Sequence, residues 1–180
     1  MWTGQQFKGK RIGTLLLWVF LGTCQVLGQS QLLDSLRTRL RTEGKTTLRV
    51  DLLQELGLQF IEAGDDSDSY RLAEEARALA TELDYPKGLA LALAFDAQRS
   101  RSEKRYPEAL AAYKESIARL DAIRAPQGLY SPLATIRGVF NDMGAQEQRL
   151  LFYQEALQRY ERTGPRHNVA ACHHGLGGYT

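Results

Sequence analysis

The sequence predicts an all-α superhelix built from helical hairpins that recur about every forty residues. Three observations predict this fold. Apolar residues return at helical spacing along most of the chain, and no stretch shows the alternation of a half-buried strand. Small and aromatic residues return at a fixed interval of forty residues. Turn-forming residues separate the periodic segments at the same interval.

Two ladders of equivalent positions carry the forty-residue period. The first ladder comprises Leu56-Gly57 with Phe60, Asp96-Ala97 with Ser100, Ile136-Arg137 with Phe140, and Leu176-Gly177 with Thr180. The second ladder comprises Ser69, Ala109 and Arg149; Ala73, Tyr113 and Tyr153; and Ala76, Ser116 and Ala156. Self-similarity of this length is typical of an array of small units, of which about three are needed for stability.

The ladders also predict which residues pack the repeats together. Antiparallel helices approach closely only where side chains are small, and an aromatic ring one turn away fills the space beside them. The residues expected in these contacts are Leu56, Gly57, Ala76, Ala109, Tyr113, Tyr153 and Ala156. Glycines at 57 and 177 are expected to let helix backbones touch, at a cost of about 1 kcal/mol relative to alanine. The alternative fold is a non-repeating helical bundle.

The segment 1–28 differs from the rest of the chain. Lys8, Lys10 and Arg11 form a basic start, and an apolar run over residues 12–22 follows. Residues 26–28 then supply the small or apolar positions of a cleavage site. These features predict a secretory signal peptide cleaved after about Gly28, and hence an exported protein, periplasmic or extracellular. A membrane anchor is the alternative, but the run is shorter than the roughly 20 apolar residues that span a bilayer.

Removing this segment changes the charge balance. The whole chain carries 23 basic and 21 acidic residues, and the predicted signal peptide holds three of the basic ones and none of the acids. The rest of the chain is therefore close to neutral and has no basic tract, which argues against a nucleic-acid partner. It keeps one cysteine, Cys172, so no internal disulfide is expected.

Residues 29–45 are predicted to form a separate amphipathic helix, because their leucines recur at helical spacing. Gly44 stands where a helix C-cap is expected. The repeat array is predicted to begin at residue 46, and either Thr46 or Thr47 can cap its first helix.

Helices and breaks alternate from there on. Apolar periodicity predicts helices over about residues 50–61, 69–83, 89–99, 107–123, 131–141 and 147–162. The segments 64–68, 100–105 and 142–145 are predicted turns within hairpins, and the proline- and glycine-containing segments 85–88, 125–128 and 164–165 are predicted breaks between units. The units are therefore residues 50–88, 89–128 and 129–168, followed by an incomplete fourth unit at 169–180.

The residues that carry the period resemble the tetratricopeptide repeat family, in which Leu-Gly-x-x-Phe/Tyr in a first helix precedes Ala-x-x-x-Tyr-x-x-Ala in a second. The clearest first helices are LLQELGLQF (residues 52–60) and LATIRGVF (133–140). The clearest second helices are RYPEALAAYKESI (105–117) and LLFYQEALQRY (150–160). The resemblance covers the chain from about Thr46 onward. It implies a superhelix of helical hairpins that binds protein or peptide, without catalysis.

The chain departs from the family pattern at several points. Its period is forty residues, whereas the usual period of the family is 34. Asp96 and Ser100 stand where apolar and aromatic residues are expected, and Arg137 and Arg149 stand where small residues are usual. These departures predict looser packing in the middle of the array.

The signal peptide, the leucine-rich lead helix and the forty-residue units are similar to the exported sensor regions of bacterial tetratricopeptide histidine kinases and related signalling proteins. In such proteins the repeats precede a membrane helix and a cytoplasmic effector. Since the sequence stops within the first helix of a fourth unit, we expect a fragment of a longer protein, which would meet the membrane only through a segment beyond Thr180. The alternative is a complete secreted scaffold in envelope assembly.

The resemblance also implies where a ligand binds, because set positions of each first helix line the concave groove of family members. Those positions are Asp51, Gln54, Leu58 and Ile61; Leu91, Ala94, Gln98 and Arg101; and Ser131, Ala134, Gly138 and Asn141. The binding residues we select from them are Gln54, Leu58, Gln98, Arg101 and Asn141. The expected partner is an extended or helical peptide. For the apolar positions, the alternative is simple packing against adjacent units.

Signals of catalysis or metal binding are weak. The sequence has no nucleophile elbow, phosphate-binding loop or paired zinc motif. His167, Cys172, His173 and His174 suit zinc or copper, but neighbouring residues of a helix point around it rather than converge. The aspartates of residues 65–68 lack the glycine and distal glutamate of a calcium loop and are expected to cap a helix. We therefore expect no enzyme activity, no metal and no cofactor, with a metal-binding protein as the remaining alternative.

Overall fold

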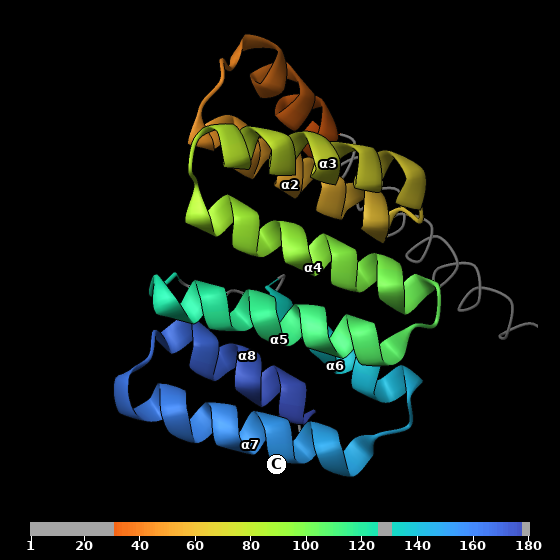
Figure 1. Ribbon diagram of the computed structural model, residues 1–180, viewed down its shortest axis with the longest axis vertical. Coiled ribbons are helices and arrows are strands. Elements are labelled where there is room, and N and C mark those ends of the chain that lie inside the picture. Colours follow the sequence, from red (N-terminus) through yellow and green to blue (C-terminus); the bar gives the residue numbers. More distant parts are fainter. Residues whose placement is uncertain (1–30, 126–130, 178–180) are drawn as a thin grey trace, which may run out of the picture. The chain divides into compact units, whose positions relative to one another are not determined.

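The structure is a computed structural model in which residues 31–125 and 131–177 are described (Figure 1). The predicted signal peptide, residues 126–128 of a predicted break and Thr180 lie outside these ranges. The chain divides into two compact units, Met1–Glu43 and Gly44–Thr180. The described part of the first unit is a helix over residues 31–42, as its leucine spacing predicts. All regular secondary structure within the described ranges is helical.

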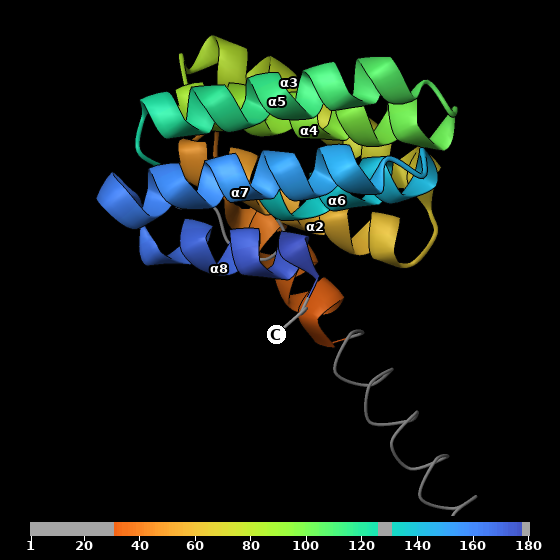
Figure 2. The ribbon, with the colours of Figure 1, turned by 90° about the horizontal axis from the view of Figure 1, so that it is seen from below.

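The second unit is a series of stacked helical hairpins (Figure 1). Its helices are α2 (Thr47–Glu62), α3 (Asp66–Glu82), α4 (Pro86–Ser102), α5 (Tyr106–Ala122), α6 (Pro132–Asp142), α7 (Gln146–Thr163) and α8 (Arg166–Leu176). Each second helix contacts the first helix of the next hairpin, and the first helices α2, α4, α6 and α8 contact one another in succession. Figure 2 shows that the axes of the helices in this stack run in nearly the same direction. The predicted all-α hairpin repeat is confirmed.

Five turns between these helices share one geometry and recur at a constant interval, which is half of the sequence period. Residues 64, 84, 104, 124 and 144 have positive φ angles of 79°, 47°, 62°, 52° and 66°. In each turn, the next N–H donates to the carbonyl five residues earlier, as from Asp65 to Phe60 at 2.8 Å and from Arg105 to Ser100 at 2.7 Å. This Schellman motif satisfies carbonyl groups that a helix end leaves without partners. Each period of the sequence thus contains two equal half-periods of the backbone.

A proline interrupts this series at the following turn. The donor expected one half-period after Ala145 is Pro165, which has no N–H to offer the Tyr160 carbonyl. Gly164 instead adopts an extended conformation with φ −96° and ψ 165°, as suits a residue before proline. Its own N–H donates to the Tyr160 carbonyl at 2.8 Å. The predicted break at 164–165 is therefore present but differs in geometry from the other turns.

Short polar side chains begin three of the helices. Thr46, Asp65 and Ser131 each accept a hydrogen bond from the backbone N–H three residues later. This contact satisfies one of the four N–H groups without intrahelical partners at a helix start. Of the two predicted threonine caps, Thr46 is the one used. The expectation that the aspartates after residue 64 cap a helix is also confirmed.

The predicted break at residues 85–88 is wrong in extent. Helix α4 already begins at Pro86, because the first turn of a helix tolerates a residue without an N–H. Gly88 is a buried helical residue, where a Cβ would lie 2.8 Å from Val50 Cγ1 and 2.9 Å from Ala80 Cβ. Glycine at this position therefore serves packing rather than the turn. At the other end, α4 continues to Ser102, which narrows the predicted turn at 100–105 to three residues.

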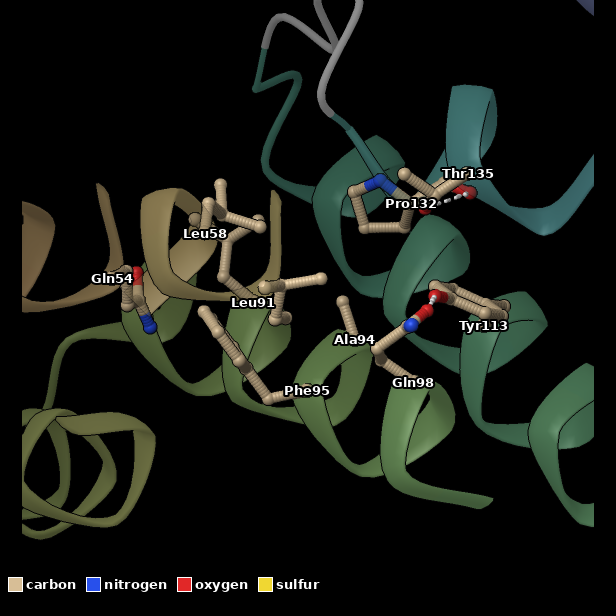
Figure 3. Close-up of a pocket in the computed structure, with 10 residues that line it drawn as sticks. Gln54, Leu58, Leu91, Ala94, Phe95, Gln98, Tyr113, Pro132 and Thr135 are labelled. Atoms are coloured by element: carbon tan, nitrogen blue, oxygen red, sulfur yellow. Dashed lines mark hydrogen bonds between the residues drawn. The ribbon is translucent and has the colours of Figure 1, made fainter. Parts of the chain in front are cut away.

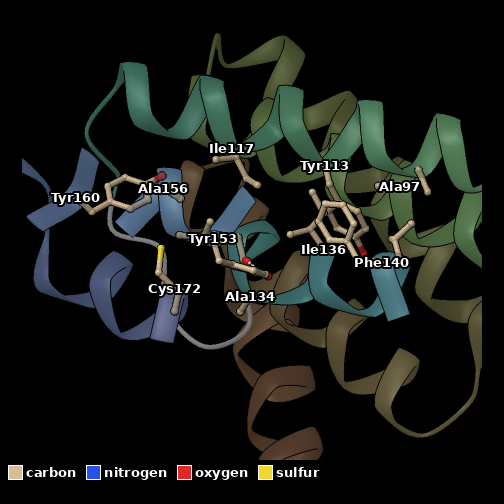
Figure 4. Close-up of a cluster of buried hydrophobic side chains, with 14 residues drawn as sticks. Ala97, Tyr113, Ile117, Ala134, Ile136, Phe140, Tyr153, Ala156, Tyr160 and Cys172 are labelled. Carbon is tan, nitrogen blue, oxygen red and sulfur yellow. Dashed lines mark hydrogen bonds between the residues drawn. The ribbon is translucent and has the colours of Figure 1, made fainter. Parts of the chain in front are cut away.

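The second ladder forms the buried seam of the array, and Figure 4 shows Tyr113, Tyr153 and Ala156 from it. All of its residues are at most 5% exposed, and the predicted packing residues Leu56 and Gly57 are buried as well. The Tyr153 hydroxyl donates to the Leu133 carbonyl at 2.7 Å, and the Ser116 hydroxyl donates to the Ala90 carbonyl at 2.6 Å. These bonds compensate the burial of the hydroxyl groups and tie second helices to first helices.

The close backbone approach predicted for Gly57 and Gly177 is found at Gly57 but not at Gly177. Gly57 does approach a neighbouring backbone, since a Cβ there would lie 3.5 Å from the Ser69 carbonyl oxygen and 3.1 Å from the Phe95 ring. Gly177 does not: it ends α8 in the left-handed conformation with φ 74°. The close approach in this part of the chain occurs at Gly175, where any Cβ would overlap the ring of Tyr153.

Loose packing is found in the third hairpin rather than in the middle one. Helices α4 and α5 pack closely despite Asp96 and Ser100, whereas α6 and α7 contact each other least of the three pairs. Asp96 accepts an ion-paired hydrogen bond from Arg77 at 2.6 Å. In the third hairpin, Arg149 is only 5% exposed and donates to the Gly175 carbonyl at 3.1 Å. Arg149 therefore bonds α7 to α8 rather than to α6.

Replacing Lys104 with glycine should stabilise the protein. A residue with a side chain at this left-handed position is strained, so Lys104→Gly is expected to raise the free energy of unfolding by about 0.5–1 kcal/mol. Thermal unfolding followed by circular dichroism measures the effect. Lys104→Ala is the matched control and should leave the midpoint nearly unchanged. A lower midpoint for the glycine variant would contradict the assigned turn geometry.

Candidate functional site

A cavity of about 80 Å³ lies on the face formed by the first helices (Figure 3). Helices α2, α4 and α6 contribute most of its wall, and α5 contributes one tyrosine. The lining residues are Gln54, Leu58, Ile61, Leu91, Ala94, Phe95, Gln98, Tyr113, Pro132 and Thr135. The wall is almost entirely apolar, with polar groups only at the two glutamines, the tyrosine and the threonine.

Half of the predicted groove positions converge on this cavity. They are Gln54, Leu58, Ile61, Leu91, Ala94 and Gln98. The stacking of α2 against α4 brings them together, because equivalent positions of successive first helices lie beside one another. The structure thus places Gln54, Leu58 and Gln98, three of the selected binding residues, at one site.

The other predicted groove positions lie elsewhere. Asp51 accepts hydrogen bonds from the Tyr85 hydroxyl and the Lys87 ammonium group at 3.0 Å each. Ser131 caps α6, and Ala134 is buried in the hydrophobic core.

The two remaining binding candidates also lie outside the cavity wall. The Arg101 Nε donates to Asp142 Oδ2 at 2.6 Å, and its guanidinium group lies over Gly138, where a Cβ would be 2.5 Å from Nη1. This ion pair fixes the arginine against α6. Asn141 is exposed near the end of α6.

Four lining residues were not among the predicted groove positions. Phe95 and Thr135 each follow a predicted position by one residue, and Pro132 begins α6. Tyr113 was predicted only as a packing residue. Phe95 could have been found, because Leu91, Phe95 and Gln98 share helical spacing. The contribution of Tyr113 depends on the contact between α4 and α5 and has no local signal.

Gln54 is a deeply buried polar residue of the wall, with 3% exposure. Its Nε2 donates to the Gly88 carbonyl at 2.8 Å, which fixes the amide orientation because a reversed amide would face oxygen with oxygen. Its Oε1 has no hydrogen-bond partner within the described ranges. A buried acceptor without a partner is costly, so a donor that reached this oxygen would gain a hydrogen bond.

The amide of Gln98 offers a hydrogen-bond donor, which complements the acceptor of Gln54. Its Oε1 accepts a hydrogen bond from the Tyr113 hydroxyl at 3.1 Å (Figure 3). Burial raises the pKa of Tyr113, so the phenol remains a protonated donor at neutral pH. The amide Nε2 has no hydrogen-bond partner within the described ranges and can act as a donor.

The histidine and cysteine residues near the C-terminal end do not converge. Cys172 is fully buried in the core (Figure 4), whereas His173 and His174 are exposed. No group of three His, Cys, Asp or Glu side chains with the geometry of a metal site occurs in the described part of the chain. The arrangement of α8 therefore does not support the metal-binding alternative.

The comparisons with known proteins add no family assignment. The sequence matches no protein-family model, and no curated protein matches it either. None of the described helices has both the length and the apolar character needed to cross a membrane. The function is therefore inferred from the cavity and the residues around it.

Cys172 should be unreactive until the protein unfolds. Burial raises the pKa of its thiol to about 11, so only about 0.1% is thiolate at pH 8. In a Cys24→Ser chain, a chromogenic disulfide reagent at pH 8 is expected to label Cys172 at least 100-fold more slowly in buffer than in denaturant. A small reactive thiol compound measured alongside gives the reference rate. Equal labelling in both solvents would place Cys172 on the surface instead.

Proposed function

We propose that this protein is a non-catalytic repeat module of the tetratricopeptide type, which binds a peptide segment of a partner protein. The observation that carries the proposal is the cavity on the first-helix face, lined by six of the positions that the resemblance to the tetratricopeptide family implies for a ligand groove. Mostly apolar pockets with a few placed polar groups are the usual form of a binding site. The two glutamine amides are such groups.

Two features of the site favour a peptide over a charged small molecule. All of its lining side chains are uncharged, so a charged ligand would lose its hydration without an ionic partner. The available polar groups are one amide acceptor and one amide donor, which match the donor and acceptor of a peptide main chain. An extended segment can use both groups and place side chains in the cavity.

We further propose that the module is exported and serves as the input region of a bacterial signalling protein. This part rests on the sequence: the basic and apolar features of residues 1–28 and the similarity of the repeats to exported sensor regions. Ligand binding between first helices would alter the curvature of the stack, because neighbouring hairpins share their contacts. A complete secreted scaffold would use the same groove without such an output.

Filling the cavity should abolish peptide binding. Ala94 lines the cavity, so Ala94→Leu occupies space that a ligand side chain needs. Peptides selected from a displayed random library on the full chain should bind the Ala94→Leu variant at least tenfold more weakly, as measured by fluorescence anisotropy.

Ala111→Leu is the matched control, since Ala111 is exposed on α5. It should bind the selected peptides like the unmodified chain. Circular dichroism establishes that both variants fold. Selected peptides that bind Ala94→Leu with undiminished affinity, or a selection that yields no binding peptide, would contradict the proposed site.

Export predicts a defined N-terminus. When the chain is expressed in a bacterium with an outer membrane, N-terminal sequencing of the protein in the envelope fraction should begin at Gln29. A chain that carries Arg in place of Leu15 and Leu17 should remain in the cytoplasm with its first residues intact. Retention of the unmodified chain in the membrane, uncleaved, would support the anchor alternative.

A further inference from the structure

The size of the cavity limits what it can hold. Its volume of about 80 Å³ is half that of the roughly 150 Å³ cavity that accommodates benzene in a protein core. This volume suits a branched aliphatic side chain better than an indole or phenol ring.

The walls of the cavity limit its chemistry in the same direction. Leu58, Leu91 and Phe95 present carbon atoms to the space, and Ala94 leaves room between them (Figure 3). Carboxylate or ammonium groups would be desolvated there without a partner of opposite charge. The favoured occupant is therefore both apolar and compact.

The buried oxygen of Gln54 adds a requirement for a hydrogen-bond donor in the ligand. Gln54 Oε1 is buried, lacks a partner within the described ranges and belongs to a side chain fixed by its bond to Gly88. An aliphatic side chain alone would leave this oxygen without a hydrogen bond. An N–H close to the aliphatic group satisfies it, and each residue of a peptide other than proline carries such an N–H beside its side chain.

We infer that the cavity takes a leucine-like aliphatic side chain of a bound peptide, and that the main-chain N–H of that residue donates to Gln54 Oε1. This inference rests on the proposed function and specifies its ligand. The Gln98 Nε2, left available because the Tyr113 hydroxyl engages Oε1, donates to a main-chain carbonyl of the same peptide. Gln54 and the size of the cavity together determine specificity.

Blocked single amino acids test the inference directly. The probes are N-acetyl-leucine N-methylamide, its tryptophan and aspartate counterparts, and a leucine analogue with an ester oxygen in place of the leucine N–H. Binding to the full, ¹⁵N-labelled chain is followed at millimolar probe concentration by NMR, through the side-chain amide signals of Gln54 and Gln98. The leucine probe should bind about tenfold more tightly than the other three, and it should shift both amide signals.

A variant separates the hydrogen bond from the apolar contact. Gln54→Leu removes the acceptor and keeps a similar volume, so the leucine probe and its ester analogue should bind this variant equally. Thermal unfolding verifies that Gln54→Leu and Ala94→Leu are folded. The Ala94→Leu variant should bind no probe, and Ala111→Leu should bind all of them like the unmodified chain.

Two results would overturn the inference. One is equal or tighter binding of the tryptophan or aspartate probe, and the other is equal binding of the ester analogue to the unmodified chain. If library-selected peptides bind in an Ala94-dependent way but lack an aliphatic residue, the inference fails and the proposed function stands. If neither peptides nor probes bind, both fail.

Discussion

The backbone hydrogen bond that closes each turn sets the length of the helices and thereby the register of the whole array. Between consecutive turns the chain has room for one helix of 17 residues, as in α3, α4 and α5. Equal spacing of the turns keeps equivalent positions opposite the same neighbours in successive hairpins. Tyr113 and Tyr153 are therefore buried alike, and Gln54 stands beside the α4 residues that complete the cavity. A turn one residue longer would rotate the next helix by about 100° and bury a different face.

Most of the fold was predictable because its signals are local. Capping by Thr46 and Asp65, the left-handed turns at Gly64 and Gly144, and the apolar spacing of each helix depend on residues close in sequence. The extent of the break at Pro86 was not predictable in this way. Proline and glycine there look like a turn, but Gly88 is required by contact with Val50 and Ala80 from two other helices. Gly175 is a second case, because the ring of Tyr153 in α7 leaves no room for a side chain at this position.

The candidate site was predictable only in part, for a related reason. The resemblance implies that Gln54, Leu58 and Gln98 lie on one face, and the stack brings them to one cavity. Arg101 was expected to bind ligand because of its position, but an ion pair with Asp142 across a hairpin boundary holds it away from the cavity. The tyrosine that orients Gln98 comes from a second helix, which the groove pattern does not include. Contacts between hairpins decide such details, and a single sequence shows them poorly.

The equal half-periods of the backbone constrain how a chain of this kind can change in length. Gain or loss of one half-period preserves the spacing of the turns but exchanges first and second helices in everything that follows. Cavity-lining residues would then occupy seam positions, and seam residues would face the groove. Gain or loss of a full period preserves both the turns and the faces. Insertion of one helix is compatible with the spacing of the turns. Only insertion of a whole hairpin is also compatible with the buried and exposed faces of the helices. The array can therefore lengthen or shorten only in steps of two helices.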